Sequence, residues 1–121
     1  MASVKEVVER LGQVKGVVGS VLVAKDGLVV ASNLSVHVQD EIVAAMVSAV
    51  GSTAVKASEM MEQGTLKSII LEAEYGKLFL TDAEIGYLGV LTAPDANMGL
   101  IRLELMEANE VLRKLTAGTS V

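Results

Sequence analysis

The residues that could carry chemistry are few in this chain and lie far apart along it. His37 is the only histidine, and cysteine is absent, so a thiolate nucleophile or thiolate metal site is excluded. A lone histidine beside a helix start is most often a surface or capping residue, and no second ligand type is spaced to join it. Nothing places Asp40 and a serine around His37 as a hydrolytic triad. We therefore expect no catalytic residue, no metal site and no cofactor.

The remaining charged residues give weak signals. Glu72 and Glu74 lie two positions apart on one face of a predicted strand, and paired acids can do acid–base work, but a solvated edge is the commoner arrangement. Arg10, Arg102 and Arg113 all fall in predicted helices, where an arginine finger could act on a GTPase but solvated helix charges are the default. The chain has neither a Walker loop nor a G-x-G-x-x-G motif.

Composition limits the class of partner. The 121 residues predict one domain over 1–121, long enough to bury about two-thirds of its unfolded surface. The core must be aliphatic, because Tyr75, Phe79 and Tyr87 are the only aromatic residues. A net charge of −5 without a basic run disfavours nucleic acid and anionic membranes. The acidic N-terminus does not resemble a signal peptide, and the longest apolar stretch, 17–24, is too short to span a bilayer. We expect a cytoplasmic protein.

Hydrophobic periodicity and turn residues predict the order αββαβββα. The first predicted element is a helix that follows Ser3, has Val4, Val7, Val8 and Leu11 on its apolar face, and is ended by Gly12 or Gly16. The others are strands 17–24 and 28–31, a helix over 40–63, strands 65–74, 77–81 and 85–93, and a helix over 98–115, with 117–121 frayed. Ser3 is the predicted cap of the first helix, and Asp26-Gly27 predicts a hairpin turn. Asp95 and Asn97 are alternative caps of the last helix. Hairpin links indicate a largely antiparallel sheet, and strands apolar on both sides indicate helices on both faces.

The long helix at 40–63 is more apolar than a one-sided surface helix requires. Its apolar residues cover an arc about 140° wide, against the ~100° stripe that one buried face needs. We interpret this as packing on the chain's own sheet with one flank and on another subunit with the next. The alternative is a helix buried deep in a single-chain core. Ser35, His37 and Asp40 are alternative N-caps, and Gly64 is the expected C-cap.

Two further segments have unusual polarity or glycine content. Strand 65–74 mixes Ser68, Glu72 and Glu74 with apolar residues, which is typical of an edge strand. Gly86 and Gly89 weaken strand 85–93 in isolation and indicate a close backbone approach or a bulge.

These segments together resemble the Roadblock / dynein light chain family over nearly the whole chain. The resemblance is carried by VVGSVLVAKDGLVVAS at 17–32, DEIVAAMVSAV at 40–50, LKSIILEAEYGKLFLTDAEIGYLGVLT at 66–92 and ANMGLIRLEL at 96–105. The terminal N-x-G-L-x-R-x-E-L stretch is most similar to the bacterial and archaeal branch. Dynein-associated members tend to end near the fifth strand, whereas this chain adds a last helix.

The resemblance implies a profilin-like α+β sandwich. Its five-stranded antiparallel sheet carries the first and last helices on one face and the long helix on the other. Two copies would join through the long helix and the third strand. Carried onto this chain, the dimer residues are Val43, Val47, Val50, Ala54, Met61, Ile69 and Leu71. On this basis Val47→Glu is expected to split the dimer, because the carboxylate would be buried unpaired.

The resemblance also implies a function. Family members are not enzymes; they bind and regulate small Ras-like GTPases or serve as scaffolds in NTPase and motor assemblies. The platform for the GTPase would be formed by Glu41, Ala45, Ser48, Ser52, Val55 and Glu59. We therefore expect a homodimeric adaptor that sets the nucleotide state or location of a small GTPase. The alternatives are a small-molecule-sensing module and a scaffold subunit; an enzyme is disfavoured by the lack of a nucleophile–base pair.

Overall fold

The computed structural model describes residues 3–34 and 39–117, and its elements follow the predicted order. They are α1 (Val4–Leu11), β1 (Val17–Ala24), β2 (Val29–Leu34), α2 (Asp40–Met60), β3 (Ser68–Ala73), β4 (Gly76–Asp82), β5 (Gly86–Thr92) and α3 (Met98–Ala117).

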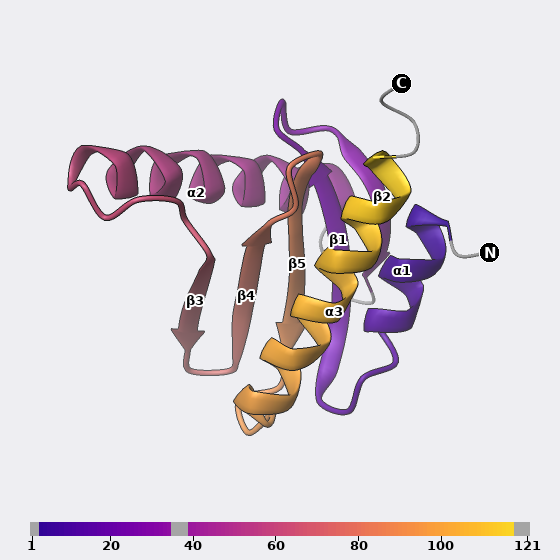
Figure 1. Cartoon of the computed structure of the whole chain (residues 1–121). Coiled ribbons are helices and arrows are strands. Elements are labelled where there is room, and N and C mark those ends of the chain that lie inside the picture. Colours follow the sequence, from indigo (N-terminus) through magenta and orange to yellow (C-terminus); the bar gives the residue numbers. More distant parts are fainter. Residues whose placement is uncertain (1–2, 35–38, 118–121) are drawn as a thin grey trace.

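The five strands form one antiparallel sheet in the order β2-β1-β5-β4-β3 (Figure 1). The hairpins β1–β2, β3–β4 and β4–β5 pair neighbours in sequence, and β1 pairs with β5 to join the two halves. β3 is an edge strand and β1 is an interior strand, which confirms both predictions. The antiparallel α+β fold is likewise confirmed.

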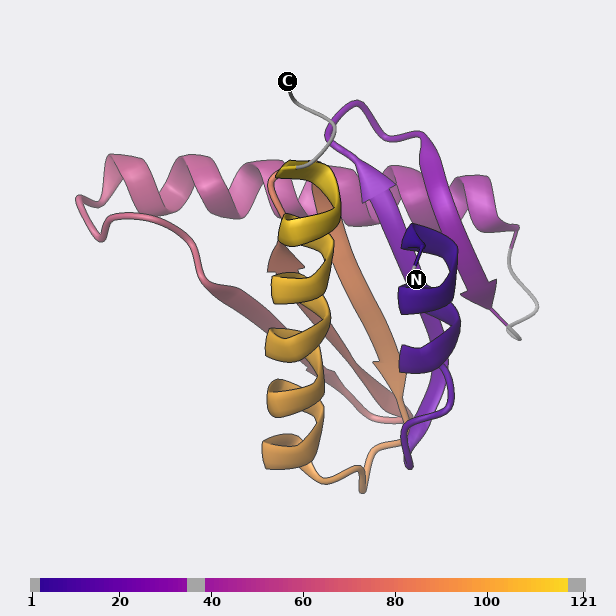
Figure 2. The same ribbon diagram turned by 45° about the vertical axis from the view of Figure 1, so that its right-hand side comes forward.

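Helices cover both faces of the sheet. α1 and α3 lie side by side on one face, and α2 crosses the other face (Figures 1 and 2). This gives two apolar cores. The larger core, under α1 and α3, includes Val8, Leu22, Phe79, Leu88, Ile101 and Leu112. The smaller core, under α2, consists of Val21, Val23, Ala44, Val47, Leu80 and Tyr87.

Local signals in the sequence set several boundaries. The Ser3 hydroxyl accepts a hydrogen bond from the Glu6 amide at 3.2 Å and caps α1. Asn97 caps α3 by accepting from the Leu100 amide at 3.0 Å. At the β1–β2 turn Gly27 has φ +93°, a conformation that glycine adopts without steric cost. These three features agree with the sequence prediction.

Close packing explains why two positions, 86 and 51, are occupied by glycine. A Cβ at Gly86 would lie 2.1 Å from the Val23 carbonyl oxygen on the paired strand, so the predicted close backbone approach is confirmed. A Cβ at Gly51 in α2 would lie 2.7 Å from ring atoms of Tyr87. Gly51 therefore lets α2 settle directly on the buried tyrosine of β5.

The ends of α2 differ from the prediction. The helix stops at Met60, Met61 is its C-cap, and Glu62 takes a positive φ of 56°, so Gly64 is not the cap. At the other end Gln39 is the N-cap without a side-chain bond, and Asp40 is already helical. The alternative caps Ser35 and His37 lie outside the described residues.

Other boundaries shift by a few residues. β2 runs three residues further than predicted, to Leu34, and β3 is shorter at both ends. α3 extends through Ala117, two residues beyond the predicted end and into the segment that the sequence predicts to be frayed. Residues 118–121 lie outside the described residues.

Candidate protein-interaction surface

α2 packs on the sheet through a narrow line of small side chains. Ala44, Val47 and Gly51 are buried at the centre of this contact. They recur at i, i+3 and i+7, which is one face of a helix. Because these residues are small, the helix axis comes close to the sheet, and the residues on the opposite side of α2 are exposed.

The exposed side of α2 carries an apolar stripe. Its members are Ile42, Met46, Ala49, Thr53 and Met60, which we call the α2 stripe. At 100° per residue they fall within about 60° of one another. Ile42 is 50% exposed, Met46 65% and Met60 76%. Exposed apolar rows of this kind mark protein-interaction sites more often than random surface does.

The edge strand β3 adds further exposed apolar surface. Leu71 is 45% exposed, and Ile69 is partly buried against the core under α2. Beyond them, the backbone of β3 pairs only with β4, so its outer N–H and C=O groups face away from the sheet. An unprotected edge of this kind can accept another strand.

The seven residues predicted to form a dimer interface differ in how exposed they are within one chain. Met61 and Leu71 are exposed, and Val43, Val50, Ala54 and Ile69 are partly buried. Val47 is only 2% exposed within one chain and has almost no surface left for a partner. Val47→Glu would place a carboxylate in the chain's own core, so it is a test of folding rather than of association. The interface itself stays a prediction.

The six residues predicted to form the GTPase platform also differ in how exposed they are. Glu41, Ala45, Ser52 and Glu59 are exposed on one flank of α2, next to the α2 stripe. Val55 is partly buried against the core under α2. Ser48 is half-buried, and its hydroxyl donates to the Lys25 carbonyl oxygen at 3.1 Å. Their role in binding stays a prediction.

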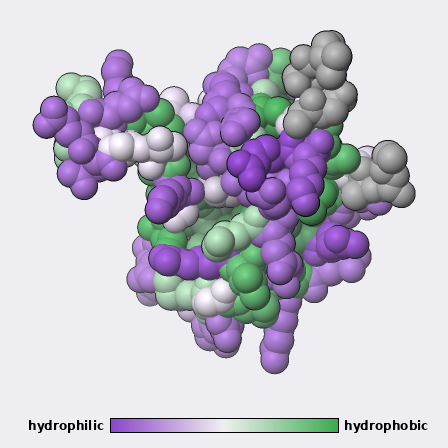
Figure 3. Space-filling model, viewed as in Figure 1, coloured by the Kyte–Doolittle hydropathy of each residue, from purple (hydrophilic) through white to green (hydrophobic). Residues whose placement is uncertain are grey.

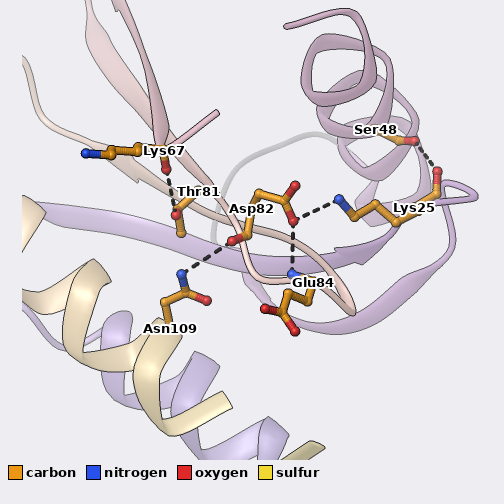
Figure 4. A network of polar contacts seen from close by, with 7 residues as sticks. All are labelled: Lys25, Ser48, Lys67, Thr81, Asp82, Glu84 and Asn109. Atoms are coloured by element: carbon orange, nitrogen blue, oxygen red, sulfur yellow. Dashed lines mark hydrogen bonds and ion pairs between the residues drawn. The ribbon is translucent and has the colours of Figure 1, made fainter. Parts of the chain in front are cut away.

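A polar network holds this flank of α2 to the sheet (Figure 4). Lys25, in the β1–β2 turn, donates to the Asp82 carboxylate at 2.8 Å and lies 4.3 Å from the centroid of the Tyr87 ring. Asp82 also accepts from the Glu84 amide at 2.9 Å. Through the Ser48 bond, the network joins α2, two hairpin turns and the buried tyrosine. Sequence reasoning missed it because Lys25 and Asp82 are 57 positions apart.

The glutamates and arginines considered for catalysis are all exposed. His37 lies outside the described residues. Glu72 is exposed on the edge strand β3, whereas Glu74 is exposed in the turn between β3 and β4, so the two acids do not share a strand as predicted. Arg113 pairs with Glu110 on the surface of α3. Within the two described ranges, no group of three or more acidic, histidine or cysteine residues could hold a metal ion.

The fold and its exposed helix define a class of small α+β proteins that present one long helix on a sheet. The Roadblock/LC7 domain family model matches residues 3–92. The chain therefore belongs to the Roadblock/LC7 family, whose members are regulators and adaptors rather than catalysts.

The chain is also similar to other proteins and to solved structures. Two relatives from Methanocaldococcus jannaschii, the uncharacterized proteins MJ1340 and MJ0310, are each 38% identical over 112 residues, covering 93% of this chain and 98% of each relative. The fold is similar to Myxococcus xanthus MglB, with a TM-score of 0.88, 19% identity and 95% of both chains covered. It is also similar to a Roadblock/LC7 domain from Streptomyces avermitilis, with a TM-score of 0.86, 20% identity, and 96% and 99% of the two chains covered.

None of the helices in the described part of the chain has both the length and the apolar character needed to cross a bilayer.

Proposed function

We propose that this protein is a non-catalytic, cytoplasmic homodimeric adaptor that binds a small Ras-like GTPase and modulates its nucleotide state or location. The observation that carries the proposal is the α2 stripe, an exposed apolar row on a helix that is otherwise fixed firmly to its sheet. Family membership supplies the class of partner.

Self-association would use the predicted dimer residues that keep surface in one chain, together with the adjacent α2 stripe and the edge of β3. These dimer residues are Val43, Val50, Ala54, Met61, Ile69 and Leu71. The apolar side chains of Ile42, Met46 and Met60 are exposed in one chain and would be buried by the same helix of a second copy. Pairing of two β3 edges would continue the sheet and satisfy the outer backbone groups of both strands. A structure of MglB with a tetrameric arrangement, at a TM-score of 0.78 and 17% identity, supports the idea that this fold assembles through its surfaces.

The GTPase would contact the polar flank of α2. Ala45 and Ser52 are small and exposed there, so a partner's backbone can approach the helix closely, and Glu41 and Glu59 border them. The bonds from Ser48 and Lys25 keep this flank in place against the sheet. A platform that is already ordered loses little conformational entropy when a partner binds.

The test is a binding titration with purified small Ras-like GTPases from the same genome, each loaded with GDP or a non-hydrolysable GTP analogue. We expect saturable binding to at least one GTPase, with a preference for one nucleotide state. Glu59→Arg should weaken that binding at least tenfold. Glu107→Arg makes the same charge change on exposed α3, on the other face of the sheet, and should leave binding unchanged.

Two results would contradict the proposal. One is the absence of binding to every GTPase at micromolar concentrations. The other is an equal loss of affinity in Glu59→Arg and Glu107→Arg, which would move the contact away from α2.

A further inference from the structure

The face of the sheet opposite α2 is only partly covered by helices. α3 lies beside β5, whereas β3 and the outer part of β4 have no helix over them (Figures 1 and 2). A cleft of about 450 Å³ lies here, between α3 and the β3–β4 edge of the sheet. Its volume lies in the range typical of small-molecule sites, roughly 300–1,000 Å³.

The floor of the cleft is apolar. Phe79 from β4 and Leu105 from α3 are buried at its base, and Leu66 and Met106 form its sides. Met106 is 70% exposed, so apolar surface remains accessible at the mouth. Figure 3 shows hydrophobic side chains among hydrophilic ones on this face of the molecule.

The rim of the cleft is cationic, although the whole chain carries a net charge of −5. Lys67 and Arg102 both line it and are exposed, and neither makes an ion pair with a residue in the described ranges. The single lining carboxylate, Asp82, is held by Lys25 at 2.8 Å. The unpaired charge at this cleft is therefore positive.

Two neutral polar groups of the cleft are already engaged. The Thr81 hydroxyl donates to the Lys67 carbonyl oxygen at 3.0 Å, and the Asn109 amide donates to the Asp82 carbonyl oxygen at 3.3 Å (Figure 4). These bonds hold β4 to the segment before β3 and to α3, and Lys67 and Arg102 are the cationic donors of the cleft. A guanidinium binds a carboxylate with two parallel hydrogen bonds.

We propose that this cleft binds a small amphipathic carboxylic acid, with its apolar chain on Phe79 and Leu105 and its carboxylate at Arg102 and Lys67. A neutral alcohol would leave the two cations unpaired, and an amine would be repelled by them. The site lies on the other side of the sheet from α2, so it requires neither a GTPase nor the polar flank of α2. This adaptor would then also sense a small molecule.

The test is a titration of the full-length, ¹⁵N-labelled protein with decanoate below its micelle-forming concentration, followed by amide chemical shifts. We expect saturable shifts at Ser68, Thr81 and Asn109. Decanol and decylamine, which share the chain but not the charge, should bind at least tenfold more weakly.

Variants that remove positive charges test where the carboxylate of the ligand binds. The double variant Lys67→Ala/Arg102→Ala should raise the Kd for decanoate at least tenfold. As a control, Arg10→Ala removes another exposed arginine, which lies on α1 outside the cleft, and should leave the Kd for decanoate unchanged. Because all three side chains are exposed, folding should be preserved, and the amide spectra check this directly.

Three outcomes would overturn the proposal. The first is the absence of saturable shifts with decanoate. The second is equal affinity for decanoate and decanol, or no effect of the double variant, since either would leave only a non-specific apolar groove. The third is a set of shifts centred on Ile42 and Met46, which would mean that the acid adsorbs to the α2 stripe. None of these outcomes depends on whether a GTPase binds.

Discussion

Met46 and Val47 are adjacent on α2 but lie about 100° apart around the helix, one on the surface and one in the core, which allows folding and association to be separated. Met46 is 65% exposed and belongs to the α2 stripe, whereas Val47 is 2% exposed and belongs to the core under α2. Replacing each with alanine keeps helix propensity high, so differences between the two variants report on what each side chain contacts.

The two substitutions are expected to affect different processes: Val47→Ala the unfolding of one chain, and Met46→Ala the dissociation of the dimer. Val47→Ala removes buried methyl groups and leaves a cavity, so it should lower the free energy of unfolding by about 2 kcal/mol. Met46→Ala should change the unfolding of one chain by less than about 0.5 kcal/mol, because the residue is on the surface. In a symmetric dimer Met46 would be buried twice, at about 1–2 kcal/mol per copy. The Kd for dissociation should therefore rise roughly 30- to 1,000-fold.

The assay combines urea unfolding with sedimentation at several protein concentrations. Since dimer dissociation contributes to the apparent stability, the unfolding of single chains is compared at the lowest concentrations. If Met46→Ala dissociates no more readily than wild type, the α2 stripe is not the interface. If Val47→Ala unfolds like wild type, the packing of α2 on its own sheet is wrong.

Three further predictions concern the packing beneath α2 and α1. Gly51→Ala should destabilise the fold by about 1–3 kcal/mol despite the better helix propensity of alanine, because its Cβ would lie 2.7 Å from the Tyr87 ring; the urea midpoint measures this. Lys25→Ala should cost less than about 1 kcal/mol, and the cost should shrink in high salt, since the pair with Asp82 is partly exposed. Ser20→Ala should cost about 1–3 kcal/mol by thermal unfolding, because its buried hydroxyl donates to a carbonyl oxygen of α1 at 2.6 Å.

Much of the fold could be predicted from local signals in the sequence. The run at 17–24 is apolar on both alternating faces, which only an interior strand requires, and the structure places β1 there. The polar residues of β3 indicated an edge, and the cap at Ser3 fixed the start of α1. Each of these depends on a few neighbouring residues, so the sequence alone carries the information.

The surface of α2 was harder to predict. The apolar arc included both Met46 and Val47, but periodicity cannot say which part of a wide arc faces the chain's own sheet. That choice is made by Gly51 and Tyr87, whose contact brings one line of the helix against the sheet. Lys25 and Asp82 could not be paired from the sequence, because their contact depends on how the two hairpin turns meet beneath α2.

The central claim, that two copies associate through α2 and β3, is tested most directly by the molar mass of the wild-type protein in solution. Light scattering across a hundredfold range of concentration would measure it. The account predicts a stable mass near twice the 12.6 kDa of one chain. A mass of one chain at every concentration would contradict it and leave the α2 stripe to a different partner.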